Sequence, residues 1–155
     1  ASVGTGFSSV VVSAGKAYTL GNRDAADVLV CFDAIQGHEV WRQSYPAELD
    51  PNLFEGGPTA TPTVAGRDEF TFSRQGLAAC WEADSGAERW RVDVPRTCGV
   101  DVPGWGFSGS PVVDGDRVLL NAGSAGVALN RRTGEVLWQS DNVRIRERRV
   151  AGAGD

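Results

Sequence analysis

The sequence is short of the residues that most enzymes use for chemistry. Its 155 residues include no methionine, one histidine, one lysine and three cysteines. With His38 as the only imidazole, a zinc hydrolase centre or a Ser-His-Asp triad has little support. Three cysteines cannot all pair with one another, which argues against a small disulfide-stabilised fold.

Long apolar segments and excess positive charge are lacking too. The best apolar stretch, 28–32, is the size of a strand, whereas a membrane-spanning helix needs about 18 residues. No basic segment followed by an apolar one opens the chain, so no signal peptide is visible. The net charge of −5 argues against sequence-independent binding to nucleic acid, because neutralising phosphates requires a basic face.

What the sequence does contain is turn-forming residues and tryptophan. Twenty glycines, seven prolines and five tryptophans indicate many turns, and therefore short strands in preference to helices. One pattern occurs three times: an Asp, Glu or Asn eight residues before a Trp, and a Gly four residues before it. The tryptophans are Trp41, Trp90 and Trp138, at intervals of 49 and 48 residues, and the glycines are Gly37, Gly86 and Gly134. A period as even as this predicts a structural repeat.

A second series of segments precedes the first. Each consists of two apolar runs around a tight turn, which is typical of a β-hairpin. The segments are 9–18, 60–70 and 109–118. A third strand is expected at 28–33, 77–82 and 126–130, and a fourth strand carries the Trp. Four strands in each period of about 50 residues predict an all-β fold, a partial or open β-propeller of about three four-stranded antiparallel blades.

The repeated motif resembles that of a known family. Its pattern, Ala-x-Asp-x-x-Thr-Gly-x-x-x-Trp, is similar to the tryptophan-docking motif of the pyrroloquinoline quinone (PQQ)-like β-propellers, and the resemblance covers roughly residues 7–140. The third copy keeps Ala128, Thr133, Gly134 and Trp138 but has Asn130 in place of the Asp. The resemblance implies that each motif Trp packs between adjacent blades as a structural residue. The implied blade-docking residues are Trp41, Trp90, Trp138, Gly37, Gly86 and Gly134.

The blades account for most of the chain. We expect residues 1–142 to form three blades, at about 7–45, 58–94 and 107–142, and the Arg-rich residues 143–155 to be an edge strand or disordered. Three blades do not close a ring. The chain is therefore a fragment of a longer propeller, a protomer that closes a ring with its copies, or a piece docked on a partner. Exposed strand edges predict self-association.

A cofactor enters only through the resemblance. The family includes dehydrogenases that hold PQQ and calcium at the propeller centre, using a stacking Trp and a disulfide between adjacent cysteines. This sequence has no adjacent cysteine pair and no region that matches that site, so no catalytic residue, cofactor or metal ligand is expected. Trp105 is a weak candidate for stacking on a central ligand, and the alternative is a loop Trp that caps a blade.

The three cysteines have simpler explanations. Cys31 and Cys80 occupy equivalent positions, where the resembling family has Ala, and each is expected to be a small buried side chain. Cys98 is expected in an accessible loop, which leaves a Cys80–Cys98 disulfide open.

The long segment 45–58 is the best candidate for a partner-binding loop. In it, Leu53 and Phe54 either form a partner-binding knob or cover the adjacent blade. The expected function is a non-catalytic PQQ-like propeller segment, a scaffold or protein-binding module that presents loops 45–58 and 94–107 to a protein partner or further blades. The resemblance implies a bacterial extracytoplasmic compartment such as the periplasm. The alternatives are a fragment of a PQQ- and calcium-dependent dehydrogenase and a ligand-sensing propeller domain.

Overall fold

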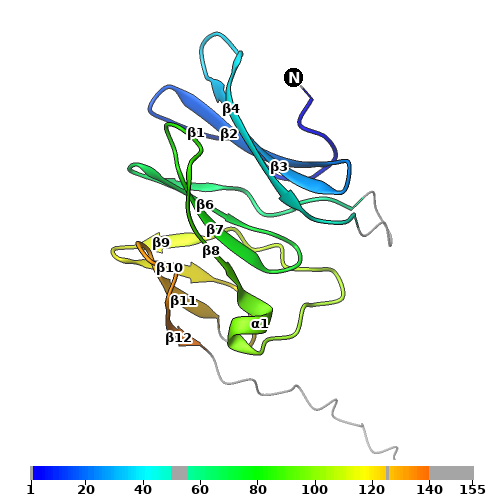
Figure 1. Ribbon diagram of the computed structural model, residues 1–155, viewed down its shortest axis with the longest axis vertical. Coiled ribbons are helices and arrows are strands. Elements are labelled where there is room, and N and C mark those ends of the chain that lie inside the picture. Colours follow the sequence, from blue (N-terminus) through cyan, green and yellow to red (C-terminus); the bar gives the residue numbers. More distant parts are fainter. Residues whose placement is uncertain (1, 50–55, 125, 140–155) are drawn as a thin grey trace, which may run out of the picture.

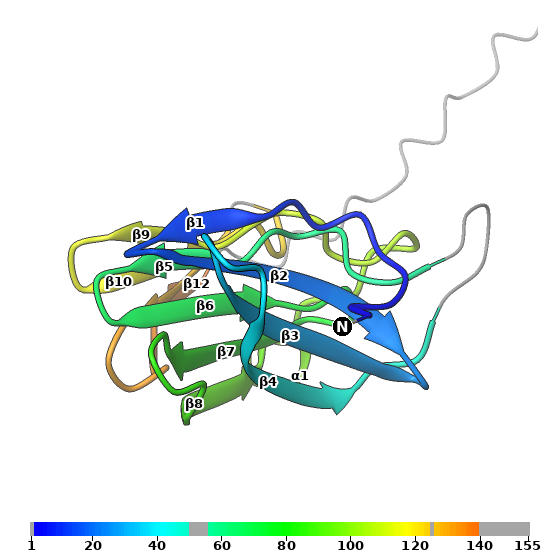
Figure 2. The same ribbon diagram turned by 90° about the horizontal axis from the view of Figure 1, so that it is seen from above.

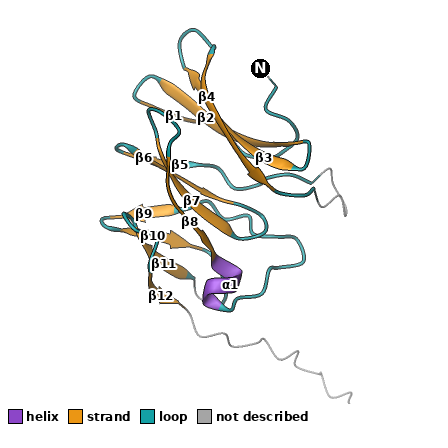
Figure 3. Ribbon diagram, viewed as in Figure 1, coloured by secondary structure: helices purple, strands orange, loops and turns teal. Residues whose placement is uncertain are grey.

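The computed structural model describes residues 2–49, 56–124 and 126–139, which form three four-stranded antiparallel sheets and one short helix (Figures 1 and 3). Blade 1 consists of β1 (Val11–Ser13), β2 (Lys16–Arg23), β3 (Ala26–Asp33) and β4 (Glu39–Pro46). Blade 2 consists of β5 (Thr63–Ala65), β6 (Asp68–Phe72), β7 (Leu77–Glu82) and β8 (Glu88–Asp93). Blade 3 consists of β9 (Val112–Asp114), β10 (Arg117–Leu120), β11 (Val127–Asn130) and β12 (Val136–Gln139). The predicted all-β class and four-stranded blades are confirmed.

The blades stack face to face, with β1, β5 and β9 side by side along the inner edge (Figures 1 and 2). Hydrogen bonds at equivalent positions join the segments that lead into these inner strands. The Ser9 amide donates to the Thr61 hydroxyl oxygen at 3.1 Å, and the Thr61 amide donates to the Ser110 hydroxyl oxygen at 2.9 Å. The result is a partial propeller in which each blade contacts only its neighbours.

Two apolar layers hold the stack together. The layer between blades 1 and 2 includes Tyr18, Leu20, Leu29, Cys31, Trp41, Tyr45, Ala79 and Trp81. The layer between blades 2 and 3 includes Phe70, Phe72, Cys80, Trp90, Val118, Leu120, Val127 and Leu129. Because successive side chains of a strand point to opposite faces, blade 2 contributes to both layers and is covered on both sides.

The strand connections divide between two ends of the stack. The turn end carries the β1–β2 and β3–β4 connections and their equivalents in the other blades. The loop end carries the described parts of the connections 24–25, 47–49, 56–62, 73–76 and 94–111 (Figure 2). The turns of the turn end are short and uniform. The connections of the loop end differ from blade to blade, and so does the surface that they build.

A helix that the sequence analysis did not predict lies at the loop end. In α1 (Val94–Cys98), the Asp93 side chain caps the N-terminus by accepting from the Arg96 amide at 3.0 Å, and Gly99 ends the helix with φ of 63°. The sequence did contain a signal for this helix. It is an Asp followed by Val-Pro, with a Gly six positions after the Asp. The helix buries Cys98, which is 3% exposed, so the expectation of an accessible thiol is wrong. Cys31, Cys80 and Cys98 are all buried, and none of the three forms a disulfide.

Some expectations concern residues that the structure does not describe. Leu53, Phe54 and the Arg-rich residues 143–155 lie outside the described residues. In the ranges that are described, no helix is long and apolar enough to cross a membrane.

Candidate functional site: docking turns, outer faces and loop end

The contact between blades 1 and 2 centres on Trp41, which β4 directs onto the β7–β8 turn. Its indole Nε1 donates to the Ala83 carbonyl at 3.0 Å, and the side chain is 9% exposed. The ring covers Gly86 so closely that a Cβ on this residue would lie 2.6 Å from Trp41 Cε3. Gly86 also has φ of +72°, so both the space and the backbone conformation favour glycine here.

The contact between blades 2 and 3 repeats this geometry. Trp90 Nε1 donates to the Arg131 carbonyl at 2.9 Å, and a Cβ on Gly134 would lie 2.9 Å from the Trp90 ring. Phe70 packs on the same indole, with ring centroids 6.0 Å apart. Each internal interface therefore joins a Trp of one blade to a Gly turn and a backbone carbonyl of the next.

The acidic or amide residue of the motif shapes the receiving turn. The Asp33 carboxylate accepts from the amides of Ile35 and Gln36, and these bonds lower the pKa of Asp33. The Asn130 amide oxygen accepts from the amides of Arg132 and Thr133 in the same way. Either side chain supplies the acceptor that this turn requires, which explains why Asn can replace Asp in the third copy.

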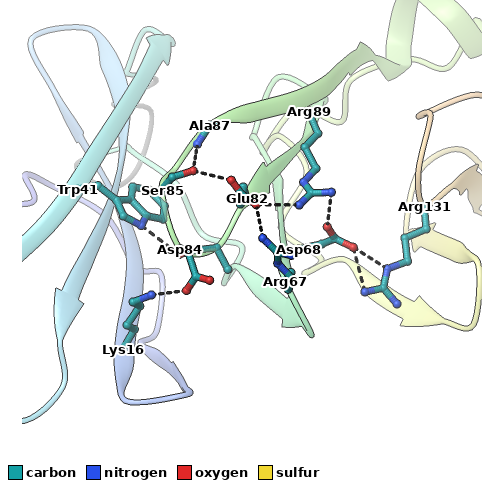
Figure 4. A network of polar contacts seen from close by, with 11 residues as sticks. Lys16, Trp41, Arg67, Asp68, Glu82, Asp84, Ser85, Ala87, Arg89 and Arg131 are labelled. Carbon is teal, nitrogen blue, oxygen red and sulfur yellow. Dashed lines mark hydrogen bonds and ion pairs between the residues drawn. The ribbon is translucent and has the colours of Figure 1, made fainter.

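In blade 2 the motif residue is Glu82, and its longer side chain makes different contacts from those of Asp33 and Asn130 (Figure 4). It accepts from the Ser85 hydroxyl at 2.9 Å and forms ion pairs with Arg67 and Arg89. Ion pairs also cross both blade boundaries. Lys16 of blade 1 binds Asp84 of blade 2, and Asp68 of blade 2 binds Arg131 of blade 3 at 3.0 Å. Asp84 is 65% exposed, which limits the Lys16–Asp84 pair to about 1 kcal/mol or less. The side chains of Asp68 and Arg131 are only 18% and 24% exposed, so water screens that pair less.

Among the residues that the structure describes, the two outer faces of the stack lack this contact. Trp138, the third motif tryptophan, is 45% exposed, and Gly37 has no atom within 4 Å of the position its Cβ would take. The two outer blades also expose large apolar side chains. Blade 1 exposes Val10, Val12, Ile35 and Val40, and blade 3 exposes Val112, Leu137 and Trp138.

A matched pair of glycine substitutions tests the docking geometry. Gly86 and Gly37 share φ of +72°, so an alanine strains the backbone equally at both positions. Only Gly86→Ala also forces a methyl group against the Trp41 indole. We expect Gly86→Ala to lower the free energy of unfolding by about 1–3 kcal/mol more than Gly37→Ala does, as measured by urea denaturation. Equal losses would show that the indole yields without cost.

At the loop end, connections from different blades are held together by the turn 73–76 (Figure 2). The Arg74 guanidinium donates to the Trp105 carbonyl at 2.8 Å, and the side-chain amide of Gln75 donates to the Glu48 carbonyl at 3.0 Å. The Trp105 side chain is 54% exposed. Leu49 and Val102, on the same two connections, are 40% and 45% exposed.

Comparison with known proteins identifies the family. The chain matches the family of the outer membrane protein assembly factor BamB over residues 24–153. The chain belongs to this family of PQQ-like propeller proteins. No curated protein matches the sequence.

Solved PQQ-like propellers share the fold at low sequence identity. A europium-containing methanol dehydrogenase is similar with a TM-score of 0.65 and 18% identity, over 88% of this chain and 25% of that one. BamB from Moraxella catarrhalis is similar with a TM-score of 0.59 and 22% identity, over 86% of this chain and 35% of that one. The quinohemoprotein alcohol dehydrogenase of Comamonas testosteroni gives a TM-score of 0.61 and 19% identity, over 86% of this chain and 20% of that one. This chain thus spans about a fifth to a third of these relatives.

The hollow beside Trp105, the candidate stacking residue, does not fit the cofactor of the PQQ-like dehydrogenases. The hollow beside Trp105, lined by Arg74, Gln75, Val102, Pro103 and Gly106, has a volume of about 70 Å³. Small-molecule pockets are roughly 300–1,000 Å³, so a tricyclic quinone is too large for it. The part of the chain that is described also has no group of three His, Cys, Asp or Glu side chains placed to hold a metal ion.

One titratable residue of this PQQ-like propeller is buried where no partner reaches it. Glu69 on β6 is fully buried, and neither carboxyl oxygen has a hydrogen-bond partner among the described residues. Its cross-strand neighbours are Val64 and Trp81. Burial raises the pKa of Glu69 to about 8. Burial also raises the pKa of the Cys31 thiol to about 11, and the Glu69 carboxylate adds to that rise.

Proposed function

We propose that this chain is a non-catalytic PQQ-like propeller segment that works as a protein-binding scaffold. The observation that carries the proposal is the loop end, where Leu49, Val102 and Trp105 expose apolar side chains on connections of two different blades. Exposed apolar patches mark interaction sites for proteins or membranes and grooves that bind ligands. The family match also supports the scaffold proposal, because BamB is by its name an assembly factor.

The hydrogen bonds of the loop end suit it to this role. The carbonyls of Glu48 and Trp105 are both held by side chains of the turn 73–76, so the two apolar connections are fixed to one rigid blade. Binding to such a surface orders few groups, and this limits the entropy lost on association. We place the scaffold in a bacterial extracytoplasmic compartment, as the names of its relatives suggest.

A second candidate is a piece of a PQQ- and calcium-dependent dehydrogenase. The observation that favours it is the exposed Trp105 ring on a blade connection, in a fold that a methanol dehydrogenase shares. The hollow of about 70 Å³ beside Trp105 opposes it. A ligand-sensing propeller is a third alternative, to which no contact of the described residues adds support.

Crosslinking tests the scaffold role directly. A photo-crosslinking phenylalanine analogue in place of Trp105 is expected to label one protein from the envelope fraction of the source organism. The same analogue at Asp116, in the exposed β9–β10 turn at the opposite end, is the control and is expected not to label that protein. Excess unlabelled chain should suppress the adduct, and the Leu49→Ala/Val102→Ala variant should suppress it less. Equal labelling at both positions would contradict the proposal.

A cofactor titration separates the two main candidates. PQQ with calcium is expected to cause no saturable quenching of tryptophan fluorescence, since the hollow beside Trp105 is too small for the quinone. Saturable quenching that disappears in Trp105→Ala would favour the dehydrogenase candidate instead.

A further inference from the structure

Two exposed carboxylates border the apolar side chains of the loop end. Glu48 directly precedes Leu49, and Asp101 directly precedes Val102, on the two connections that expose apolar groups. We infer that the loop end binds a basic and apolar protein segment, one that presents an apolar side chain between arginine or lysine side chains. This inference rests on the proposed function and names the chemical class of the partner.

The two carboxylates stand out because they are unpaired. In the described part of the chain, every other acidic side chain except the buried Glu69 takes part in an ion pair or a hydrogen bond. The side chains of Glu48 and Asp101 do neither, although both are exposed. Unpaired carboxylates leave a local negative potential, which attracts a basic partner and repels an acidic one.

The turn 73–76 brings both connections to the border of one hollow. The side-chain amide of Gln75 donates to the Glu48 carbonyl, and Gln75 and Val102 both line the hollow of about 70 Å³ beside Trp105. Since one water takes up about 30 Å³, the hollow has room for only a few heavy atoms, such as the end of one aliphatic side chain. The Trp105 ring, which is 54% exposed, adds a surface on which a guanidinium group can stack.

The basic residues at or beside the described connections of the loop end do not cancel the negative charge. Arg74 lines the hollow but is only 5% exposed. Its charge acts on the buried carboxyl group of Asp27, since burial raises the pKa of Asp27 and Arg74 opposes that rise. The exposed basic residues each have a neighbouring carboxylate as partner, in the pairs Arg23–Asp24 and Arg96–Asp93.

Synthetic peptides test the inference on the full chain without the natural partner. The first fluorescent peptide alternates arginine with leucine, the second has glutamate in place of each arginine, and the third has serine in place of each leucine. We expect saturable binding of the first peptide, measured by fluorescence anisotropy, and binding at least about tenfold weaker for the other two. The inference is overturned if the first peptide does not bind, or if either of the others binds equally well.

Reversal of charge locates the binding site. Glu48→Lys/Asp101→Lys should raise the dissociation constant of the arginine-leucine peptide by about tenfold or more at low ionic strength, because like charges then face each other. Asp114→Lys/Asp116→Lys is the matched control, since it changes the net charge by the same amount at the turn end. All four side chains are exposed, so neither variant should unfold.

The control variant should change the dissociation constant by less than about threefold, and the difference between the variants should shrink in about 300 mM salt. Equal losses in the two variants would reveal a general effect of net charge and overturn the inference.

The crosslink at Trp105 distinguishes failure of this inference from failure of the proposed function. We expect the envelope-protein adduct to be lost in Glu48→Lys/Asp101→Lys and kept in Asp114→Lys/Asp116→Lys. An adduct that forms equally well in both variants would keep the scaffold role and overturn the basic partner. Absence of any adduct in the otherwise unchanged chain would reject the scaffold role and this inference with it.

Discussion

Glu69→Gln is expected to remove most of the loss of stability that this protein shows as the pH rises from about 5 to 9. The folded protein holds the carboxyl protonated up to a pKa of about 8, whereas the unfolded chain ionises it near its ordinary value of 4.5. Between these values the folded state binds the extra proton, so the free energy of unfolding falls as pH rises, by roughly 1.4 kcal/mol per pH unit. The contribution is fully present below the unfolded pKa and is lost once the pH passes the folded one.

The position of Glu69 makes the effect large. The side chain lies in the layer between blades 1 and 2, beside Trp81 and Val64, with no partner for either oxygen among the described residues. The equivalent residue of blade 3 is Val118, which is buried in the layer between blades 2 and 3. The interface geometry therefore accepts an apolar side chain here, and an ionised one costs the desolvation of a charge.

Urea denaturation at a series of pH values measures the effect. The difference between wild type and Glu69→Gln should grow steadily from pH 5 to 8 and then level off, reaching several kcal/mol. Glu48→Gln, which changes an exposed carboxylate, is the control and should leave the profile unchanged. A parallel pair of profiles for wild type and Glu69→Gln would show that the carboxylate finds a partner.

Trp90→Ala and Trp138→Ala are expected to differ widely in stability although the two residues occupy the same motif position. Trp90 is 8% exposed, packs on Gly134 and Phe70, and donates to the Arg131 carbonyl. Its truncation leaves a cavity and an unpaired carbonyl between blades 2 and 3, at a cost of about 3–5 kcal/mol. Trp138 is 45% exposed, and its truncation in dilute solution should cost less than about 1 kcal/mol.

Denaturation followed by far-ultraviolet circular dichroism distinguishes the two variants. Because blades interact only with their neighbours, Trp90→Ala is also expected to broaden the transition, with blade 3 unfolding first. Trp41→Ala, which acts on the other internal interface, should resemble Trp90→Ala. A loss of stability in Trp138→Ala as large as that in Trp90→Ala would mean that the outer face of blade 3 is covered in the single chain.

Much of the architecture was present in the sequence because a repeat is a local pattern. The even spacing of Trp41, Trp90 and Trp138 and the paired apolar runs around a turn were enough to predict three four-stranded blades. The exception was α1, where a capping Asp and a Pro start a single helical turn that carries no apolar period long enough to detect. The same turn buries Cys98, which sequence alone had placed in an accessible loop.

The repeat, its turns and the identity of the docking residues follow from local sequence, since each depends on residues within one period of the chain. Which of those residues make a contact depends on how the blades pack. Trp41 and Trp90 are covered and Trp138 is exposed because burial depends on whether another blade stands beside it, and no local pattern records that. The same holds for Glu69, an unremarkable charge in an alternating strand until the face of blade 1 closes over it and deprives its carboxylate of water.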